Sequence, residues 1–87
     1  MLIKCEIVSG PEELGNRVQD VSGSEIDPVE TACRFASYLD ERLKDAGATD
    51  SSLDGTTRTL AITGYDGVVR RYQVSCHVSR HYHARRV

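Results

Sequence analysis

The sequence of 87 residues contains no tryptophan and a single phenylalanine, Phe35. Its hydrophobic core must therefore be built mainly from Val, Ile, Leu, Ala and Tyr. A chain of this length buries only about 60–65% of the surface that it exposes when unfolded. We therefore expect residues 1–87 to form one small domain. No apolar run approaches the roughly 20 residues that a membrane helix needs, so we expect no membrane partner.

Cysteine is also scarce, with only Cys5, Cys33 and Cys76 in the chain. A small secreted domain that depends on disulfides usually carries an even and denser set. The N-terminus also lacks a basic segment followed by an apolar stretch and a small-residue cleavage site. These features predict three reduced thiols and a cytoplasmic location.

Signatures of catalysis are missing as well. The seven glycines are scattered singly, so no glycine-rich loop is present to hold a phosphate. Cys76 precedes His77, but neighbours in a strand face opposite sides, so this imidazole is poorly placed to activate the thiol. We expect no enzyme activity, no catalytic residue and no cofactor.

Charge, in contrast, is plentiful and segregated. Residues 1–56 carry five basic and twelve acidic side chains, a net charge of −7, whereas residues 57–87 carry six arginines and one acid, a net charge of +5. The two parts account for the overall charge of −2. Such asymmetry favours a charged partner, but a compact fold could also bring the two parts together.

The strongest local signal is a helix start at Asp27-Pro28-Val29-Glu30. Asp27 can accept hydrogen bonds from the first turn, Pro28 suits the first helical position, and Glu30 completes a capping box. We expect the helix to continue to about Ala46, because Gly47 can adopt the left-handed conformation that ends a helix.

Spacing within this helix predicts its two faces. An apolar stripe at intervals of three and four consists of Val29, Ala32, Ala36, Leu39 and Leu43. Two pairs of opposite charge, Glu30–Arg34 and Asp40–Lys44, have the favourable separation of four residues. We predict that the outer face is acidic and binds a partner through Asp40, Glu41 and Asp45.

Alternating residues predict three strands, at residues 2–8, 57–64 and 68–82. Asp66-Gly67 between the last two is a strong hairpin signal. We interpret residues 12–25 as a loop with one helical turn, and we expect residues 83–87 to fray. The predicted fold is α+β, in the order β-α-β-β, with one helix packed on a three-stranded, mainly antiparallel sheet.

The last predicted strand carries most of the basic residues. Its even positions from Tyr72 to Val78 form the core face, and its odd positions are polar throughout. Arginine can grip phosphate, and Tyr or His can stack on bases. The segment therefore predicts a surface for a protein partner or a nucleic acid, formed by Arg70, Arg71, His77, Arg80, His81 and Arg85.

Three histidines of this segment, His77, His81 and His83, share one face of a regular strand. Alternate histidines on a strand can ligate one metal ion. No acid lies nearby in the sequence, however, so we interpret them as a solvated, weakly basic strand end and expect no metal site.

A small α+β chain without enzyme motifs, with an acidic helix formed by Asp40, Glu41 and Asp45, resembles the phage-encoded anti-CRISPR inhibitors in size and organisation. The resemblance implies a non-catalytic protein in the host cytoplasm that binds a CRISPR surveillance complex or nuclease and blocks nucleic-acid recognition. The basic strand departs from a simple DNA mimic and suggests contact with an acidic protein surface or guide RNA. The alternative is a small nucleic-acid-binding protein that uses the Arg- and His-rich strand.

Overall fold

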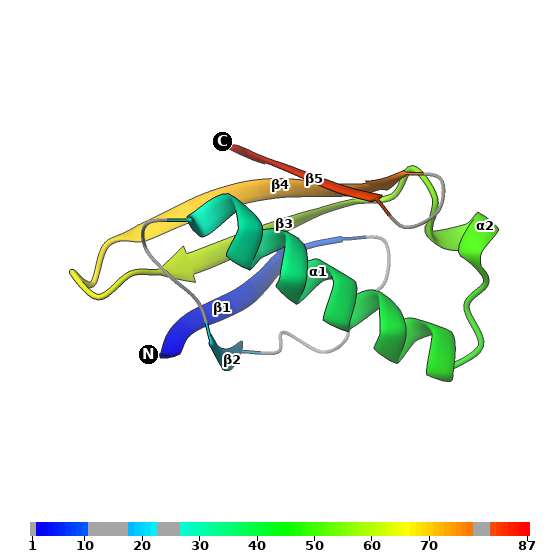
Figure 1. The fold of residues 1–87 in the computed structure, drawn as a ribbon, viewed down its shortest axis with the longest axis horizontal. Coiled ribbons are helices and arrows are strands. Elements are labelled where there is room, and N and C mark those ends of the chain that lie inside the picture. Colours follow the sequence, from blue (N-terminus) through cyan, green and yellow to red (C-terminus); the bar gives the residue numbers. More distant parts are fainter. Residues whose placement is uncertain (1, 11–17, 23–26, 78–80) are drawn as a thin grey trace.

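The computed structural model describes residues 2–10, 18–22, 27–77 and 81–87. These residues form an antiparallel sheet with one long helix, α1, packed against it (Figure 1). The elements in chain order are β1 (Leu2–Ser9), β2 (Val18–Ser22), α1 (Pro28–Asp45), α2 (Asp50–Leu53), β3 (Thr57–Thr63), β4 (Val69–His77) and β5 (His81–Arg86). The predicted α+β class is confirmed, but the described sheet has five strands where we expected three.

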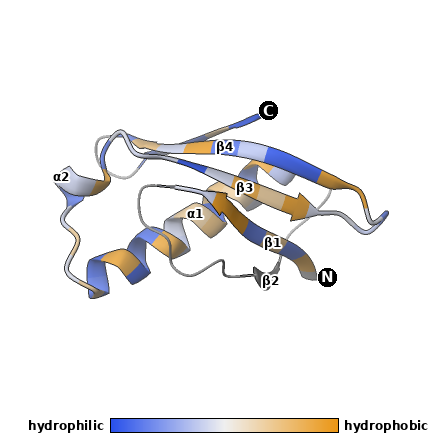
Figure 2. Ribbon diagram, turned by 180° about the vertical axis from the view of Figure 1, so that it is seen from behind, coloured by the Kyte–Doolittle hydropathy of each residue, from blue (hydrophilic) through white to orange (hydrophobic). Residues whose placement is uncertain are grey.

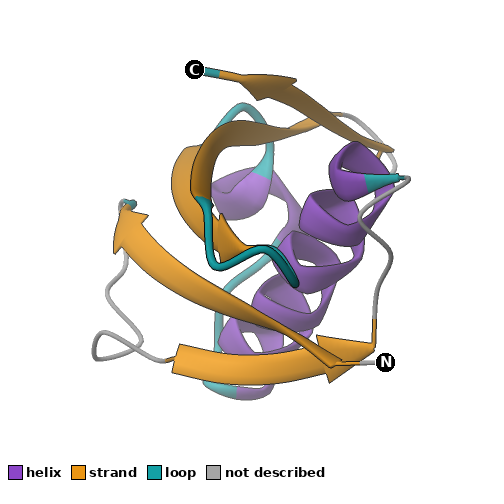
Figure 3. Ribbon diagram, turned by 90° about the vertical axis from the view of Figure 1, so that its left-hand side faces the viewer, coloured by secondary structure: helices purple, strands orange, loops and turns teal. Residues whose placement is uncertain are grey.

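The strand order in the sheet is β2-β1-β3-β4-β5, and every neighbouring pair is antiparallel. Leu60 of β3 pairs with Tyr72 of β4, and Cys76 of β4 pairs with Tyr82 of β5. β5 therefore forms one edge of the sheet, next to β4. Seen end-on, the sheet curves around one side of α1 (Figure 3).

Two expectations about the strands are wrong. Val18–Ser22, which we interpreted as part of a loop, forms β2, while residues 11–17 and 23–26 lie outside the described residues. The predicted long strand over residues 68–82 is instead the hairpin partners β4 and β5, separated by residues 78–80, which also lie outside the described part. Residues 83–86, where we expected fraying, belong to β5.

The start of α1 confirms Asp27 as the predicted N-cap, but the reciprocal half of the expected capping box is not among the described contacts, because Glu30 Oε1 accepts from Arg34 Nη2 at 3.2 Å. The Glu30 N–H donates to Asp27 Oδ1 at 3.2 Å, and Pro28 occupies the first turn. At the other end, the Gly47 N–H donates to the Lys44 carbonyl while Gly47 adopts a φ of +110°, a conformation that glycine adopts without steric cost. The helix therefore ends where the sequence predicted.

The core lies between α1 and the helix-facing side of the sheet. Two aromatic rings, those of Phe35 and Tyr72, are buried in it. The other core side chains are Ile3, Cys5, Ile7, Ala32, Ala36, Leu39, Leu60, Ile62 and Val74. Val29, which we placed in the apolar stripe, is 40% exposed, because the buried face of α1 runs instead through Thr31 and Phe35. None of the helices in the described residues combines the length and apolarity needed to cross a membrane.

Candidate functional site

The acidic surface expected on α1 is smaller than predicted, because Asp40 is fully buried. Glu41 and Asp45 are exposed as expected, but Arg42 and Lys44 are exposed beside them. The expected pair between Asp40 and Lys44 is also wrong, because Lys44 Nζ lies 2.9 Å from Asp50 Oδ1. The exposed helix surface is therefore of mixed charge, and Asp40 cannot contribute to a partner-binding face.

Asp40 instead joins a buried polar cluster, which consists of Asp40, Arg58 and Tyr82. Arg58 Nη2 lies 2.5 Å from Asp40 Oδ1, and the Tyr82 hydroxyl donates to Asp40 Oδ2 at 2.8 Å. The Arg58 contact is an ion pair without hydrogen-bond alignment, and within the described residues Asp40 Oδ1 and both Arg58 Nη atoms have no hydrogen-bond partner. The buried polar cluster links α1, β3 and β5.

Burial changes the ionisation of groups around this cluster. Desolvation, followed by the hydrogen bond and charge of Asp40, raises the pKa of Tyr82 far above its usual range. Desolvation and the Asp40 charge also raise the pKa of the Cys76 thiol. Both groups therefore stay neutral at physiological pH, and Cys76 is a protonated core thiol rather than a nucleophile.

The other side of the sheet carries a continuous polar surface. Alternation and register place one set of side chains from β3, β4 and β5 there, and we call it the outer face: Thr57, Thr59, Ala61, Thr63, Val69, Arg71, Gln73, Ser75, His77, His81, His83 and Arg85. This set of described residues contains no acidic side chain, but the exposed Glu6 of the neighbouring β1 pairs with Ala61 and lies on the same side of the sheet. Seen from behind, β4 alternates between hydrophilic and hydrophobic segments (Figure 2).

The three histidines come together on the outer face, although through a hairpin and not one strand. His77 pairs with His81 across β4 and β5, and the rings of His77 and His83 are 4.9 Å apart in an edge-to-face arrangement. Among the described residues, no group of three His, Cys, Asp or Glu side chains is arranged to hold a metal ion. His77 Nε2 also lies 3.4 Å from the Ser75 hydroxyl.

A hollow of about 320 Å³ lies beside these rings. Its lining residues are Thr57, Gln73, Ser75, His83, Ala84 and Arg85. Arg85 Nη2 and Nε donate to Gln73 Oε1 at 2.9 and 3.3 Å, so the guanidinium is held across the face of the hairpin. The hollow thus combines one oriented cation, one imidazole and the hydroxyl groups of Thr57 and Ser75.

The predicted basic residues divide between the two sides of the sheet. Arg71, His77, His81 and Arg85 lie on the outer face, whereas Arg80 lies outside the described residues. Arg70 lies on the helix-facing side and lines a second pocket. The predicted surface is therefore not one continuous patch.

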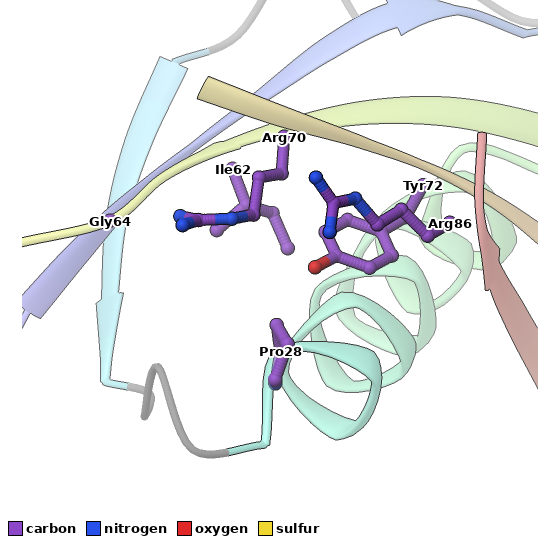
Figure 4. A pocket seen from close by; sticks show the side chains of 6 residues that line it. All are labelled: Pro28, Ile62, Gly64, Arg70, Tyr72 and Arg86. Carbon is purple, nitrogen blue, oxygen red and sulfur yellow. The ribbon is translucent and has the colours of Figure 1, made fainter. Parts of the chain in front are cut away.

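This second pocket has a volume of about 240 Å³ at the start of α1. It is lined by Pro28, Ile62, Gly64, Arg70, Tyr72 and Arg86, and the two guanidinium groups and the Tyr72 hydroxyl lie around its opening (Figure 4). Arg86 and Tyr72 were not predicted as site residues. A signal for them was present, because Arg70, Tyr72 and Arg86 all occupy even positions, and the even positions of β4 and β5 face the helix.

Comparison with protein-family models, with curated proteins and with solved structures finds no match to this chain. The site therefore has to be interpreted from its own geometry and chemistry.

Proposed function

We propose that this protein is a non-catalytic binding module that binds single-stranded nucleic acid on the outer face of β3, β4 and β5. The observation that carries the proposal is that two arginines and three histidines gather on the outer face, while the exposed Glu6 of β1 lies at its border, beside Ala61. Nucleic-acid interfaces are more polar and more positive than protein interfaces, which concentrate aromatic and aliphatic side chains at their centre. The outer face fits the first description.

The choice of a single strand follows from the shape of this surface. An open sheet has no projecting helix to enter a groove of a duplex, whereas unstacked bases can lie flat against it. The edge-to-face pair of His77 and His83 offers ring surfaces for stacking, and Arg71 and Arg85 can contact phosphates on either side.

Fluorescence anisotropy with labelled 12-nucleotide single-stranded RNA, single-stranded DNA and duplex DNA tests the proposal. With two arginines neutralising phosphates, the salt slope should be about −1.4, so affinity should fall about sevenfold between 50 and 200 mM salt. The double variant R71A/R85A should abolish most of this dependence. The control R34A/R42A removes the same charge from exposed positions of α1 and should bind like the parent chain.

No binding at 50 mM salt, or an equal loss of affinity in both double variants, would overturn the proposal. Tighter binding to the duplex than to both single strands would overturn the choice of a single strand. Cys5, Cys33 and Cys76 are free, so we expect all three thiols to be reduced in the working protein. A cytoplasmic location, where thiols stay reduced, is part of the same proposal.

Inhibition of a nucleic-acid-targeting complex, which the resemblance to anti-CRISPR proteins implies, stays a prediction. The burial of Asp40 argues against a version that depends on the acidic helix. The outer face would favour a complex that displays an accessible guide RNA. Capture of such a complex by the parent chain but not by R71A/R85A would support this form of the proposal, and equal capture by both would contradict it.

A further inference from the structure

The pocket at the start of α1 lies on the helix-facing side of the sheet, away from the outer face. Three donor-bearing side chains meet there. Tyr72 of β4 pairs with Arg86 of β5, and Arg70 lies two residues before Tyr72 on the same face. Diagonal neighbours of this kind have Cα atoms about 7–8 Å apart, so the two long guanidinium groups can reach one ligand.

Tyr72 supplies the clearest sign that the pocket is built for a ligand. Its side chain is only 2% exposed, and its hydroxyl points toward the open space above Pro28 (Figure 4). Across the described part of the chain this hydroxyl has no hydrogen-bond partner, and Arg86 has no ion pair. A phenol that is buried around its ring usually finds a partner for its hydroxyl.

The charges that surround the pocket limit what can bind. Arg70 Nη2 lies 3.2 Å from Asp66 Oδ2, and this contact positions the guanidinium at the opening of the pocket. Asp27 caps α1 at the same end by accepting from the Glu30 N–H. The Glu30 N–H is therefore already satisfied, and we expect an anion to be bound mainly by the two arginines and Tyr72.

We propose that this pocket binds the phosphate group of a small phosphomonoester, with Arg70 and Arg86 gripping phosphate oxygens and the Tyr72 hydroxyl donating to a third. Three converging donor groups match the three terminal oxygens of a phosphate better than the two of a carboxylate. The cavity of about 240 Å³ has room for the phosphate and a few further atoms. This inference is independent of the outer face.

The test is a titration of the ¹⁵N-labelled full chain, followed by NMR at pH 7.5 and constant ionic strength. Inorganic phosphate, ribose 5-phosphate and a 5′-phosphorylated tetranucleotide are the three probes. We expect saturable shifts around Arg70, Tyr72 and Arg86 with both small probes. R86Q should weaken binding about tenfold and Y72F about threefold, because each removes one donor to a charged group.

R85Q is the matched control, because Arg85 precedes Arg86 on β5 but points to the outer face. It should leave phosphate binding unchanged. Shifts that never saturate, or an equal loss in R85Q and R86Q, would overturn the site. Saturable shifts at Arg70, Tyr72 and Arg86 with the tetranucleotide but not with ribose 5-phosphate would overturn the choice of a small ligand. R71A/R85A should not affect this titration, so this inference and the proposed function fail separately.

Discussion

At the scale of single residues, the central feature is a carboxylate with no access to water. Asp40 is fully buried, and its charge is compensated by Arg58, which is itself 3% exposed. A buried ion pair often adds little net stability compared with apolar side chains of the same volume, yet removing one partner is costly because the other charge is left unpaired. Asp40 and Arg58 are therefore a dependent pair.

We predict that Asp40→Asn lowers the free energy of unfolding by about 3 kcal/mol, since it leaves the Arg58 guanidinium buried without a counter-charge. Urea unfolding, followed by circular dichroism, measures the change. Glu41→Gln is the control, because Glu41 is the exposed neighbour on the same helix and its substitution should change stability by less than about 0.5 kcal/mol.

Equal stability of these two variants would contradict a buried charge pair. If Asp40→Asn fails to fold, the double variant D40L/R58M keeps the experiment informative. It replaces both charges with apolar side chains of similar volume, so it should be clearly more stable than the single substitution.

At the scale of elements, the hydrogen bond from Tyr82 to Asp40 connects edge strand β5 to α1. Burial and the nearby Asp40 charge raise the pKa of this phenol above its value in the unfolded chain, where a tyrosine titrates near about 10. The neutral hydroxyl is therefore the form that the fold stabilises. Its contribution is complete below pH 10 and is lost as the pH rises above it.

We predict that Tyr82→Phe lowers the free energy of unfolding by about 1.5 kcal/mol at pH 7, as expected for a lost hydrogen bond to a charged group. Above pH 10 the difference between the two proteins should shrink by up to about 1.4 kcal/mol per pH unit, because only the parent chain can ionise Tyr82 on unfolding. Denaturant unfolding between pH 7 and 11 measures this. A difference that stays constant with pH would contradict the raised pKa of Tyr82.

Local signals predicted some elements well, because their causes are local. Asp27, Pro28 and Gly47 fix the ends of α1 through interactions within a few residues. The turn before β4 was also found, since Gly67 adopts a φ of +76° there. No such signal marked β2, because Val18 and Val21 are spaced three apart and suggest a helix.

The division between β4 and β5 could not be predicted from alternation. Each residue of β4 that pairs with β5 has a partner of the same parity, as His77 has in His81 and Cys76 in Tyr82. Residues of the same parity therefore lie on the same side of the sheet, whether the chain continues as one strand or turns back as a hairpin. For the same reason the histidines share a face in either arrangement, and that part of the candidate site was predicted correctly.

The sequence carries one signal for the buried polar cluster, at Arg58 of β3. Arg58 lies in phase with Leu60 and Ile62, so alternation alone places an arginine on the core face of β3. Such a residue requires a buried acid. Which acid it pairs with depends on how α1 lies across the sheet, and only the three-dimensional structure supplies that.

At the scale of the whole molecule, the charge segregation of the sequence is partly neutralised inside the fold. Asp40 from the acidic part of the chain pairs with Arg58 from the basic part. What remains lies on opposite layers, with a helix surface of mixed charge on one side and the outer face on the other. The acidic composition of the whole chain therefore does not describe the surface that we propose as the binding site.

This arrangement makes edge strand β5 part of the core, although a strand at the edge of a sheet is usually dispensable. Tyr82 and Ala84 pack against the core, and the Cys33 thiol donates to the Tyr82 carbonyl with a separation of 3.6 Å. A chain that ends at His77 would expose the core beneath Tyr82 and remove the hydrogen bond that Tyr82 donates to Asp40. In a small domain with a stability of about 5 kcal/mol, these losses should abolish folding.

We therefore predict that a chain ending at His77 shows no cooperative thermal or urea transition, whereas a chain ending at Arg85 still unfolds cooperatively. The control chain, which ends at Arg85, lacks only the exposed Arg86 and Val87. It keeps the contacts of Tyr82 and Ala84 with the core. Circular dichroism and amide exchange distinguish the two outcomes. Cooperative unfolding of the chain ending at His77 would show that β1, β3, β4 and α1 form a sufficient core. It would then follow that β5 serves the two binding sites rather than the stability of the fold.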